Sequence, residues 1–158
     1  MKILVTSDSH GAYDRLCMAA RREKPDVCFF LGDGLRDAGL LAEALPALPL
    51  YLVSGNCDFA DFAPLRGLAP LGGLLFFYTH GHSLGVKNGI DTLWQAAHES
   101  GAEVALFGHT HSPFYEYWEG IHLFNPGALS QSRAGGPTYG VITLGSGEPV
   151  FTVQPFSL

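Results

Sequence analysis

The chain has 158 residues, which is enough for a single domain covering residues 1–158 with a substantial buried core. Hydrophobic residues make up 47% of the chain and charged residues only 15%, a composition that excludes a disordered or fibrous protein. The net charge of −6 argues against binding to extended nucleic acid, because such binding requires clustered cations.

The expected location is the cytoplasm, and no membrane partner is expected. The longest apolar stretches, such as residues 74–78, are too short to cross a bilayer, and no signal peptide opens the sequence. Cys17, Cys28 and Cys57 lack CxxC spacing, so the sequence predicts neither a disulfide framework nor a thiolate zinc site.

In the first half of the chain, apolar runs of strand length alternate with amphipathic segments of helical spacing. The predicted elements are strands over residues 2–6, 27–31 and 50–53 and helices over residues 13–24 and 35–45. Pro25 and Pro46 end the two helices, since proline lacks the N–H that a continuing helix needs. This βαβαβ order predicts a parallel sheet whose functional loops lie at the carboxyl ends of the strands.

The second half changes from this alternation to strands that pair with their neighbours in the chain. The expected elements are a strand over 74–79, a helix over 88–99, a strand over 104–107, a hairpin of 114–118 with 121–124, and a pair of 139–144 with 150–153. The whole order predicts an α/β protein in which two mixed β-sheets pack as a sandwich flanked by helices.

Polar residues follow the first three predicted strands at the point where each strand ends. Asp8 and His10 follow the first strand, Asp33 the second and Asn56 the third. Oxygen and nitrogen donors gathered at one sheet edge suit manganese, iron or zinc. Taken alone, Asp33 and Asn56 also fit tight turns in which the side chain bonds to nearby backbone.

Histidines are concentrated in a few loops rather than spread along the chain. Five of the seven lie in three short segments, at residues 7–10, 79–82 and 108–111. His109 and His111 occupy a loop where neither has a core to pack against, and histidine is the commonest metal ligand. These spacings favour a metal site.

Taken in chain order, these segments resemble the five signatures of the calcineurin-like metallophosphoesterases. The segments are Asp8-Ser9-His10, Gly32-Asp33, Gly55-Asn56, Thr79-His80-Gly81-His82 and Gly108-His109-Thr110-His111. The chain is most similar to the small single-domain phosphodiesterases of this family, with which it shares Gly-Asn-Cys-Asp and the turn at Asn125-Pro126-Gly127. The resemblance spans nearly the whole chain and implies their four-layer αββα fold.

The resemblance also implies a site for two divalent cations, with Mn²⁺ expected and Fe, Ni or Zn as alternatives. Asp33 would bridge the two cations. The implied ligands of one cation are Asp8, His10 and His111, and those of the other are Asn56, His80 and His109. In such a site, a hydroxide that bridges the metals attacks the phosphorus atom in line with the leaving group.

The main departure from the family concerns the group that protonates the leaving group. Many members have a histidine after the asparagine, whereas this chain has Cys57, whose thiol suits that role poorly. Three alternatives stand: Asp58 as the catalytic substitute, His82 as the substitute, or a leaving group that departs without a proton. His82 is expected beside the metals, in contact with phosphate or a metal ligand, and a backbone hydrogen bond would equally explain it. Ala128 replaces a usual serine, while Arg133 has two interpretations, as a phosphate contact or a solvated loop residue.

These features predict a metal-dependent phosphoesterase, more specifically a phosphodiesterase, that acts on a small phosphate ester such as a nucleotide. Phe59, Phe62 and Tyr115 are candidates for stacking on a base, although aromatic residues more often simply pack. The alternative is a non-catalytic scaffold of the same fold, like the phosphoesterase-like subunit of the retromer. Scaffold relatives lose ligand side chains, whereas all the implied ligands are present here. The sequence leaves a homo-oligomer open.

Overall fold

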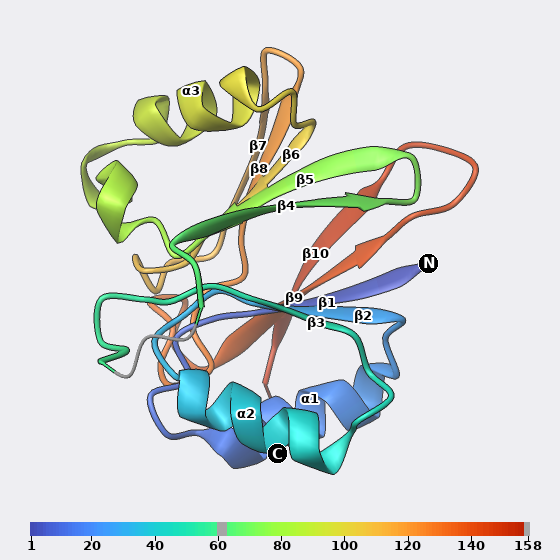
Figure 1. Ribbon diagram of the computed structural model, residues 1–158, viewed down its shortest axis with the longest axis vertical. Coiled ribbons are helices and arrows are strands. Elements are labelled where there is room, and N and C mark those ends of the chain that lie inside the picture. Colours follow the sequence, from blue (N-terminus) through green and yellow to red (C-terminus); the bar gives the residue numbers. More distant parts are fainter. Residues whose placement is uncertain (60–62, 157–158) are drawn as a thin grey trace.

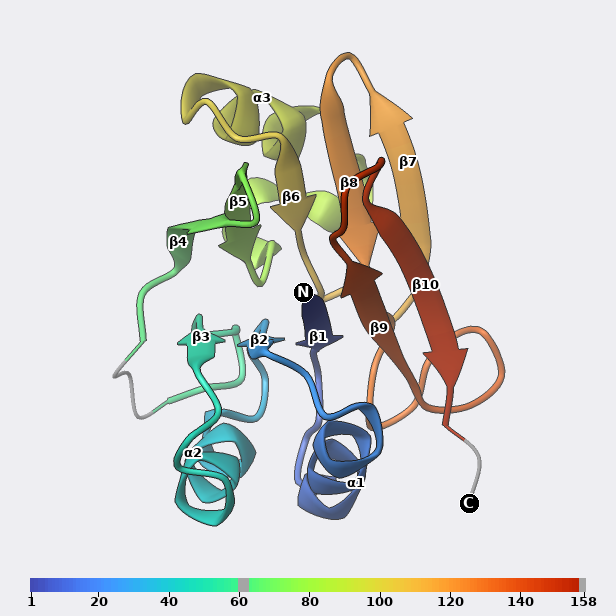
Figure 2. The same cartoon turned by 90° about the vertical axis from the view of Figure 1, so that its right-hand side faces the viewer.

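The computed structural model describes residues 1–59 and 63–156, and within these ranges two five-stranded sheets pack face to face (Figure 1). Helices cover the outer face of each sheet, so the layers run helix, sheet, sheet, helix (Figure 2). The predicted α/β sandwich of two mixed sheets is thereby confirmed. Within the described ranges, every helix is too short or too polar to span a membrane.

The first sheet has the strand order β10-β9-β1-β2-β3. Its strands are β1 (Lys2–Thr6), β2 (Val27–Phe30), β3 (Leu50–Leu52), β9 (Thr138–Thr143) and β10 (Val150–Pro155). The first three run parallel because α1 (Tyr13–Glu23) and α2 (Leu35–Ala44) return the chain to the same end of the sheet. Every residue of β2 is buried, as expected for a parallel strand covered on both faces.

The second sheet has the strand order β4-β5-β6-β8-β7. Its strands are β4 (Arg66–Leu71), β5 (Leu74–Thr79), β6 (Val104–Leu106), β7 (Phe114–Trp118) and β8 (Ile121–Asn125). Two short 3₁₀ turns, η1 (His82–Leu84) and η2 (Val86–Asn88), precede α3 (Asp91–Glu99), which packs on the outer face of this sheet. The strand pair β5 and β6 is parallel, so their carboxyl ends lie at one edge.

Two of the differences from the sequence prediction have identifiable reasons. Residues 66–71 were not among the predicted elements, yet β4 pairs antiparallel with β5 along its whole length. Pro70 is tolerated there because β4 is an edge strand, which does not need every N–H for pairing. The first helix ends one residue early because Lys24 adopts a left-handed conformation, with φ of 48°.

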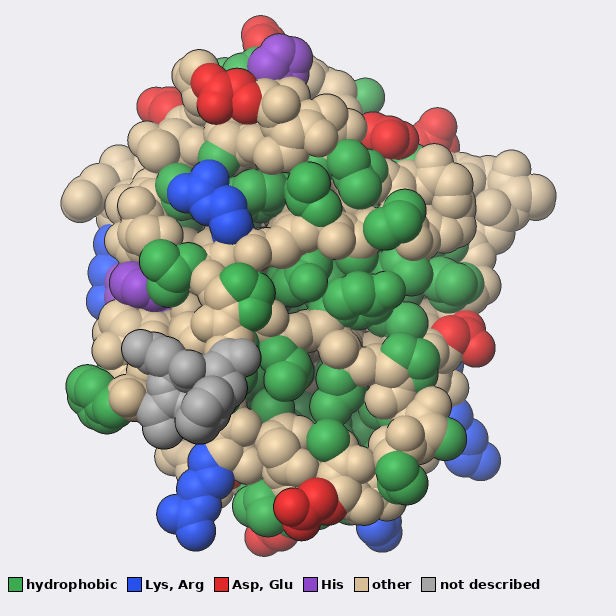
Figure 3. All heavy atoms as spheres, in the orientation of Figure 1, with side chains coloured by type: hydrophobic (Ala, Val, Ile, Leu, Met, Phe, Trp, Pro, Cys, Tyr) green, Lys and Arg blue, Asp and Glu red, His purple; other side chains and the backbone are tan. Residues whose placement is uncertain are grey.

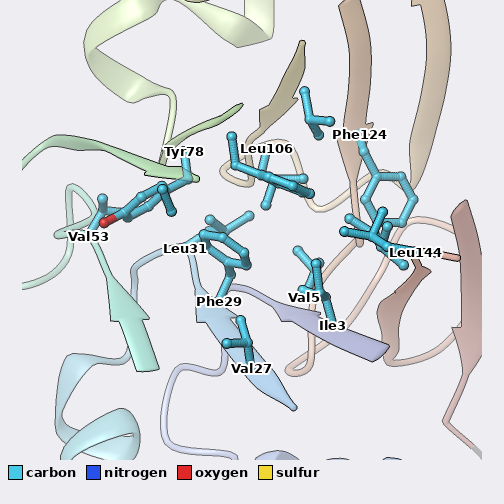
Figure 4. Close-up of a cluster of buried hydrophobic side chains, with 14 residues drawn as sticks. Ile3, Val5, Val27, Phe29, Leu31, Val53, Tyr78, Leu106, Phe124 and Leu144 are labelled. Atoms are coloured by element: carbon cyan, nitrogen blue, oxygen red, sulfur yellow. The ribbon is translucent and has the colours of Figure 1, made fainter. Parts of the chain in front are cut away.

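The core between the sheets is built from apolar side chains that both sheets direct inward (Figure 4). Phe29 lies at its centre, with ring centroids 5.7 Å from Phe76 and 5.0 Å from Tyr78. At one side of the sandwich, the edge strands β3 and β4 leave apolar side chains open to solvent, and Leu68 is 49% exposed. Figure 3 shows hydrophobic side chains gathered over the middle of this face.

We expect Phe29→Ala to lower the free energy of unfolding by about 3–5 kcal/mol, because the substitution leaves a cavity where rings from both sheets meet. Urea denaturation followed by circular dichroism measures the change. Tyr117→Ala is the matched control, since that aromatic side chain is 60% exposed and should change stability little. A similar loss in the two variants would contradict this description of the core.

Candidate metal centre

The predicted ligands lie in loops at the carboxyl ends of strands from both sheets. Asp8 and His10 follow β1, Asp33 follows β2 and Asn56 follows β3, while His80 follows β5. His109 and His111 follow β6, which brings a second loop from the other sheet to the same place. These loops gather on the left of Figure 1, away from the N-terminus.

The first group of donors surrounds the buried carboxylate of Asp8. Its Oδ1 atom lies 3.1 Å from Nε2 of His111 and 3.7 Å from Nε2 of His10. His10 Nε2 also lies 3.7 Å from Oδ2 of Asp33, so this histidine stands between two carboxylates. Asp8, His10 and His111 therefore present oxygen and nitrogen atoms close enough to hold one metal ion.

The second group surrounds His80, whose side chain is fully buried. His80 Nδ1 lies 2.7 Å from the carbonyl oxygen of Leu31, which can only accept, so Nδ1 carries the proton. Nε2 lies 3.0 Å from Oδ1 of Asn56, 3.2 Å from Nδ1 of His109 and 3.4 Å from Oδ2 of Asp33. Lone pairs gathered this closely repel one another unless a cation or a proton lies among them.

One carboxylate joins the two groups. Oδ2 of Asp33 lies within 3.7 Å of a histidine nitrogen on each side, His10 in one group and His80 in the other. The other oxygen, Oδ1, accepts the backbone N–H of Cys57 at 2.8 Å, which fixes the orientation of the carboxylate. The thiol of Cys57 also lies within ligand range of His10 and Asp33, a proximity that sequence reasoning missed.

The backbone of the centre is strained in a way that is rare elsewhere in the chain. Of the seven non-glycine residues with positive φ in the described ranges, five are predicted ligands. They are Asp8, His10, Asp33, His109 and His111, with φ between 43° and 68°. Such conformations persist only where surrounding contacts hold them, and they cluster at functional sites.

Close packing of the loops demands glycine at two points. A Cβ atom on Gly55 would collide with Oδ1 of Asp33, and one on Gly108 would collide with Oγ of Ser7. Backbone hydrogen bonds join the loops directly, from Asp8 N to Gly32 O at 2.9 Å and from Gly108 N to His80 O at 3.0 Å. The glycines of the motifs therefore let neighbouring loops approach closely enough for their side chains to converge.

The Asp58 carboxylate holds two of these loops together. Its two oxygens accept four backbone N–H groups at 2.8–3.0 Å, those of Asp33, Gly34, Leu35 and Gly55. To donate a proton elsewhere, a protonated Asp58 would have to give up at least one of these bonds. The geometry of Asp58 therefore suits the support of the loops better than the predicted proton donation.

Two further residues support the centre and were not singled out in the sequence. Asp37 accepts hydrogen bonds from Ser9 Oγ at 2.5 Å and Gly11 N at 2.9 Å, which holds the loop around His10. Ser7 Oγ donates to Oδ2 of Asp8 at 2.6 Å. Asp37 carries a weak signal in the sequence, an acidic residue in the first turn of a helix beside a metal motif.

The electrostatics of the centre differ from donor to donor. The contact with Asp8 raises the pKa of His10, and at His80 burial lowers the pKa but the Asp33 and Asp8 carboxylates outweigh it and raise the pKa, so both imidazoles favour a proton where no cation is bound. Burial raises the pKa of the Asp8 carboxyl, but hydrogen bonds from His10 and His111 outweigh it and hold this pKa below its usual value. Burial lowers the pKa of His109 to about 4, and the nearby positive charges of His80 and Lys87 act in the same direction. Asp8 is therefore ionised and His109 neutral near pH 7, the states that metal binding requires.

The other predicted site residues lie around this centre rather than in it. The His82 ring centroid is 5.4 Å from that of His80, and its Nδ1 is buried without a hydrogen-bond partner among the described residues. Arg133 is exposed, and only its backbone N–H bonds to the centre, at His111 O. The ring of Tyr115, a predicted candidate for stacking on a base, packs on Phe151.

Of the three aromatic residues predicted to stack on a base, only one is placed beside the centre. Phe59 lines a cavity together with Asn56 and His82. Phe62 lies outside the described residues.

We expect Asp58→Asn to lower the free energy of unfolding by about 1–3 kcal/mol. The amide NH₂ of asparagine is a donor, so it would face backbone N–H groups that now donate to the Asp58 carboxylate. Urea denaturation gives the value. Asp14→Asn is the matched control, since Asp14 is an exposed carboxylate in the first turn of α1 and should change stability little. Equal stability of the two variants would argue against the supporting role of the Asp58 carboxylate.

Comparison with known proteins places this geometry in a family. The family model of the calcineurin-like phosphoesterase superfamily domain matches residues 1–147. The chain is 34% identical to the probable metallophosphoesterase YsnB of Bacillus subtilis, over 91% of this chain and 85% of that protein. It is 32% identical to the phosphodiesterase YfcE of Escherichia coli K12, over 90% and 87% of the two chains.

Solved structures agree with this assignment. A predicted phosphoesterase from Streptococcus pneumoniae TIGR4 superposes with a TM-score of 0.80 at 28% identity, covering 97% of each chain. A Zn²⁺ complex of Vps29 from Entamoeba histolytica has a TM-score of 0.75 at 17% identity, covering 99% of this chain and all of the other, which shows the shared fold alone. On the strength of the family match and these relatives, the chain belongs to the calcineurin-like phosphoesterase superfamily.

Proposed function

We propose that this protein is a phosphodiesterase whose centre holds two divalent cations. The observation that carries the proposal is the pair of donor groups that share one carboxylate, Asp33, with its Oδ2 near a histidine nitrogen of each group. A carboxylate held between two sets of neutral and anionic donors is the arrangement that a pair of cations requires. The names of the relatives YsnB and YfcE support a phosphoesterase.

The donor set fits divalent cations of intermediate hardness. In our proposal, Asp8, His10 and His111 would hold one cation, Asn56, His80 and His109 would hold the other, and both would share Asp33. The amide oxygen of Asn56 adds a ligand without adding charge. Mixed oxygen and nitrogen donors suit Mn²⁺, and they also suit Fe, Ni or Zn.

When bound, the two cations would activate a water molecule and stabilise charge on the phosphoryl oxygens. The residues of the chain would orient the metal-binding donors and hold their loops in place. The carbonyl oxygen of Leu31 fixes the tautomer of His80 by accepting a hydrogen bond from Nδ1–H, which keeps Nε2 directed at the centre. Asp58 and Asp37 hold the loops in their strained conformations, so that the donors stay aligned.

For the leaving group, we propose that His82 donates the proton. His82 lines the cavity beside Asn56, whereas the carboxylate of Asp58 is taken up by backbone N–H groups. The residue Cys57 is exposed, but partial desolvation of its thiol and the negative charge of Asp33 both raise its pKa, so it gives up a proton reluctantly. Of these three groups, only His82 has a nitrogen without a hydrogen-bond partner among the described residues. Burial and the nearby charge of His80 lower the pKa of its imidazole, so the protonated form that donates is favoured as the pH falls.

A scaffold function is the second candidate, because two structures of Vps29 superpose on this chain with TM-scores of 0.77 and 0.75. One of those structures is a Zn²⁺ complex, so metal binding alone does not separate an enzyme from a scaffold of this fold. The presence of every implied ligand favours the enzyme. Hydrolysis therefore has to be measured directly.

We expect His109→Ala to reduce hydrolysis of bis(4-nitrophenyl) phosphate by at least about 100-fold without unfolding the chain, because it removes one donor of a partly exposed loop. The assay is run with Mn²⁺ and repeated after chelation, which should abolish the wild-type rate. His98→Ala, on the exposed side of α3, is the matched control and should keep full activity. Wild-type protein inactive with Mn²⁺, Fe²⁺, Ni²⁺ and Zn²⁺ would favour the scaffold.

The assignment of the proton donor is tested with two leaving groups. We expect His82→Ala to slow the release of phenol from diphenyl phosphate about 100-fold or more, because that leaving group needs a proton. Release of 4-nitrophenolate from bis(4-nitrophenyl) phosphate should slow much less, because the better leaving group departs without a proton. Cys57→Ser should leave both rates nearly unchanged. Equal losses on both leaving groups in His82→Ala would instead assign His82 to binding or support.

A further inference from the structure

A cavity of about 560 Å³ opens directly beside the candidate metal centre. Two of its lining residues, Asn56 and His82, also border the donor groups, while Phe59, Pro64 and Leu65 form an apolar wall. Its volume lies within the range of about 300–1,000 Å³ that is typical of small-molecule pockets. A phosphate ester held at the centre would therefore have room to place one substituent in this cavity.

Apart from Asn56 and His82, which face the metal centre, the polar side chains of the cavity already bond within the protein. Ser54 donates from Oγ to Ala63 O at 2.8 Å and from its backbone N–H to Pro64 O at 2.9 Å. The Asp58 carboxylate accepts four backbone N–H groups. Among the described lining residues, this leaves the apolar wall as the larger unengaged surface, which recognises shape and apolar area rather than hydrogen-bonding pattern.

The apolar wall also exposes side chains whose burial by a ligand would remove apolar surface from water. Phe59 is 92% exposed and Leu65 is 50% exposed, and both lie at the cavity. Leu65 is held in place because its carbonyl oxygen accepts the hydroxyl of Thr79 at 2.8 Å. A flat ring that entered the cavity could stack on Phe59 and contact Leu65, and both contacts remove apolar surface from water.

We propose that this cavity is the subsite for an aromatic ester substituent of the substrate. The inference rests on the phosphodiesterase function proposed above, because the phosphate must lie at the metal centre for its substituent to reach Phe59 and Leu65. Aryl esters and nucleosides both supply such a ring. The subsite recognises the ring by stacking and apolar contact, with Phe59 and Leu65 as the residues that set specificity.

The test measures binding by calorimetry to the Mn²⁺-loaded protein, so that it does not depend on turnover. The probes are methyl phenylphosphonate and methyl methylphosphonate, which share the anionic phosphoryl group and differ only in the ring. We expect the phenyl probe to bind about fivefold to tenfold more tightly. Phe59→Ala and Leu65→Ala should each reduce this ratio to about twofold or less and leave affinity for the methyl probe unchanged.

Tyr115→Ala is the matched control, because Tyr115 is an exposed aromatic residue that packs on Phe151 and bonds to His122 instead of lining the cavity. It should keep the full ratio. The methylphosphonate ester of adenosine identifies the source of the ring: tighter binding than the phenyl probe, lost in Phe59→Ala, assigns a nucleobase, and weaker binding assigns a simple aryl group.

Equal or undetectable binding of the phenyl and methyl probes by the wild type would overturn the subsite, as would a ratio that survives in both Phe59→Ala and Leu65→Ala. The two proposals fail separately. Hydrolysis without a preference for the ring refutes only the subsite. A preference for the ring without hydrolysis under any metal refutes only the enzymatic function.

Discussion

The contacts of the Asp8 carboxylate are the interaction on which the centre depends, because they join the two sheets. Asp8 follows a strand of the first sheet, yet its Oδ2 accepts the backbone N–H of His109 from the second sheet at 3.1 Å. Oδ1 faces His111 Nε2 from the same loop at 3.1 Å, and Ser7 donates to Oδ2. A buried anion with these partners fixes how the carboxyl ends of the two sheets meet, and the donor atoms of both sheets converge only in that arrangement.

The strained loops follow from this convergence. Side chains from five loops have to point at one small volume, and the left-handed backbone at Asp33 and His109 turns them there at an energetic cost of roughly 1–3 kcal/mol each. Asp58 offsets part of that cost by binding the N–H groups of Asp33 and its neighbours. The sandwich core, with Phe29 at its centre, supplies the rigid strands from which the loops depart.

Sequence patterns predicted the parts of the molecule that local chemistry determines. Buried apolar runs placed β1 and β2 within a residue, and the motif residues from Asp8 to His111 lie together as expected from strand ends. The β4 strand was missed because its pairing partner determines it, against the local signal of Pro70. The role of Asp58 was missed for a similar reason, since its four partners come from two loops that only the fold brings together.

The same physical argument bears on the choice between enzyme and scaffold. A surface used only for protein contact gains nothing from a buried carboxylate pair, five left-handed ligand residues and an unpartnered imidazole at His82. Each of these lowers stability, and selection for stability alone would remove them. The proposed enzyme accounts for their joint presence around one set of metal-binding donors, whereas a scaffold does not. In that proposal, the cavity at Phe59 would receive the group attached to the phosphate.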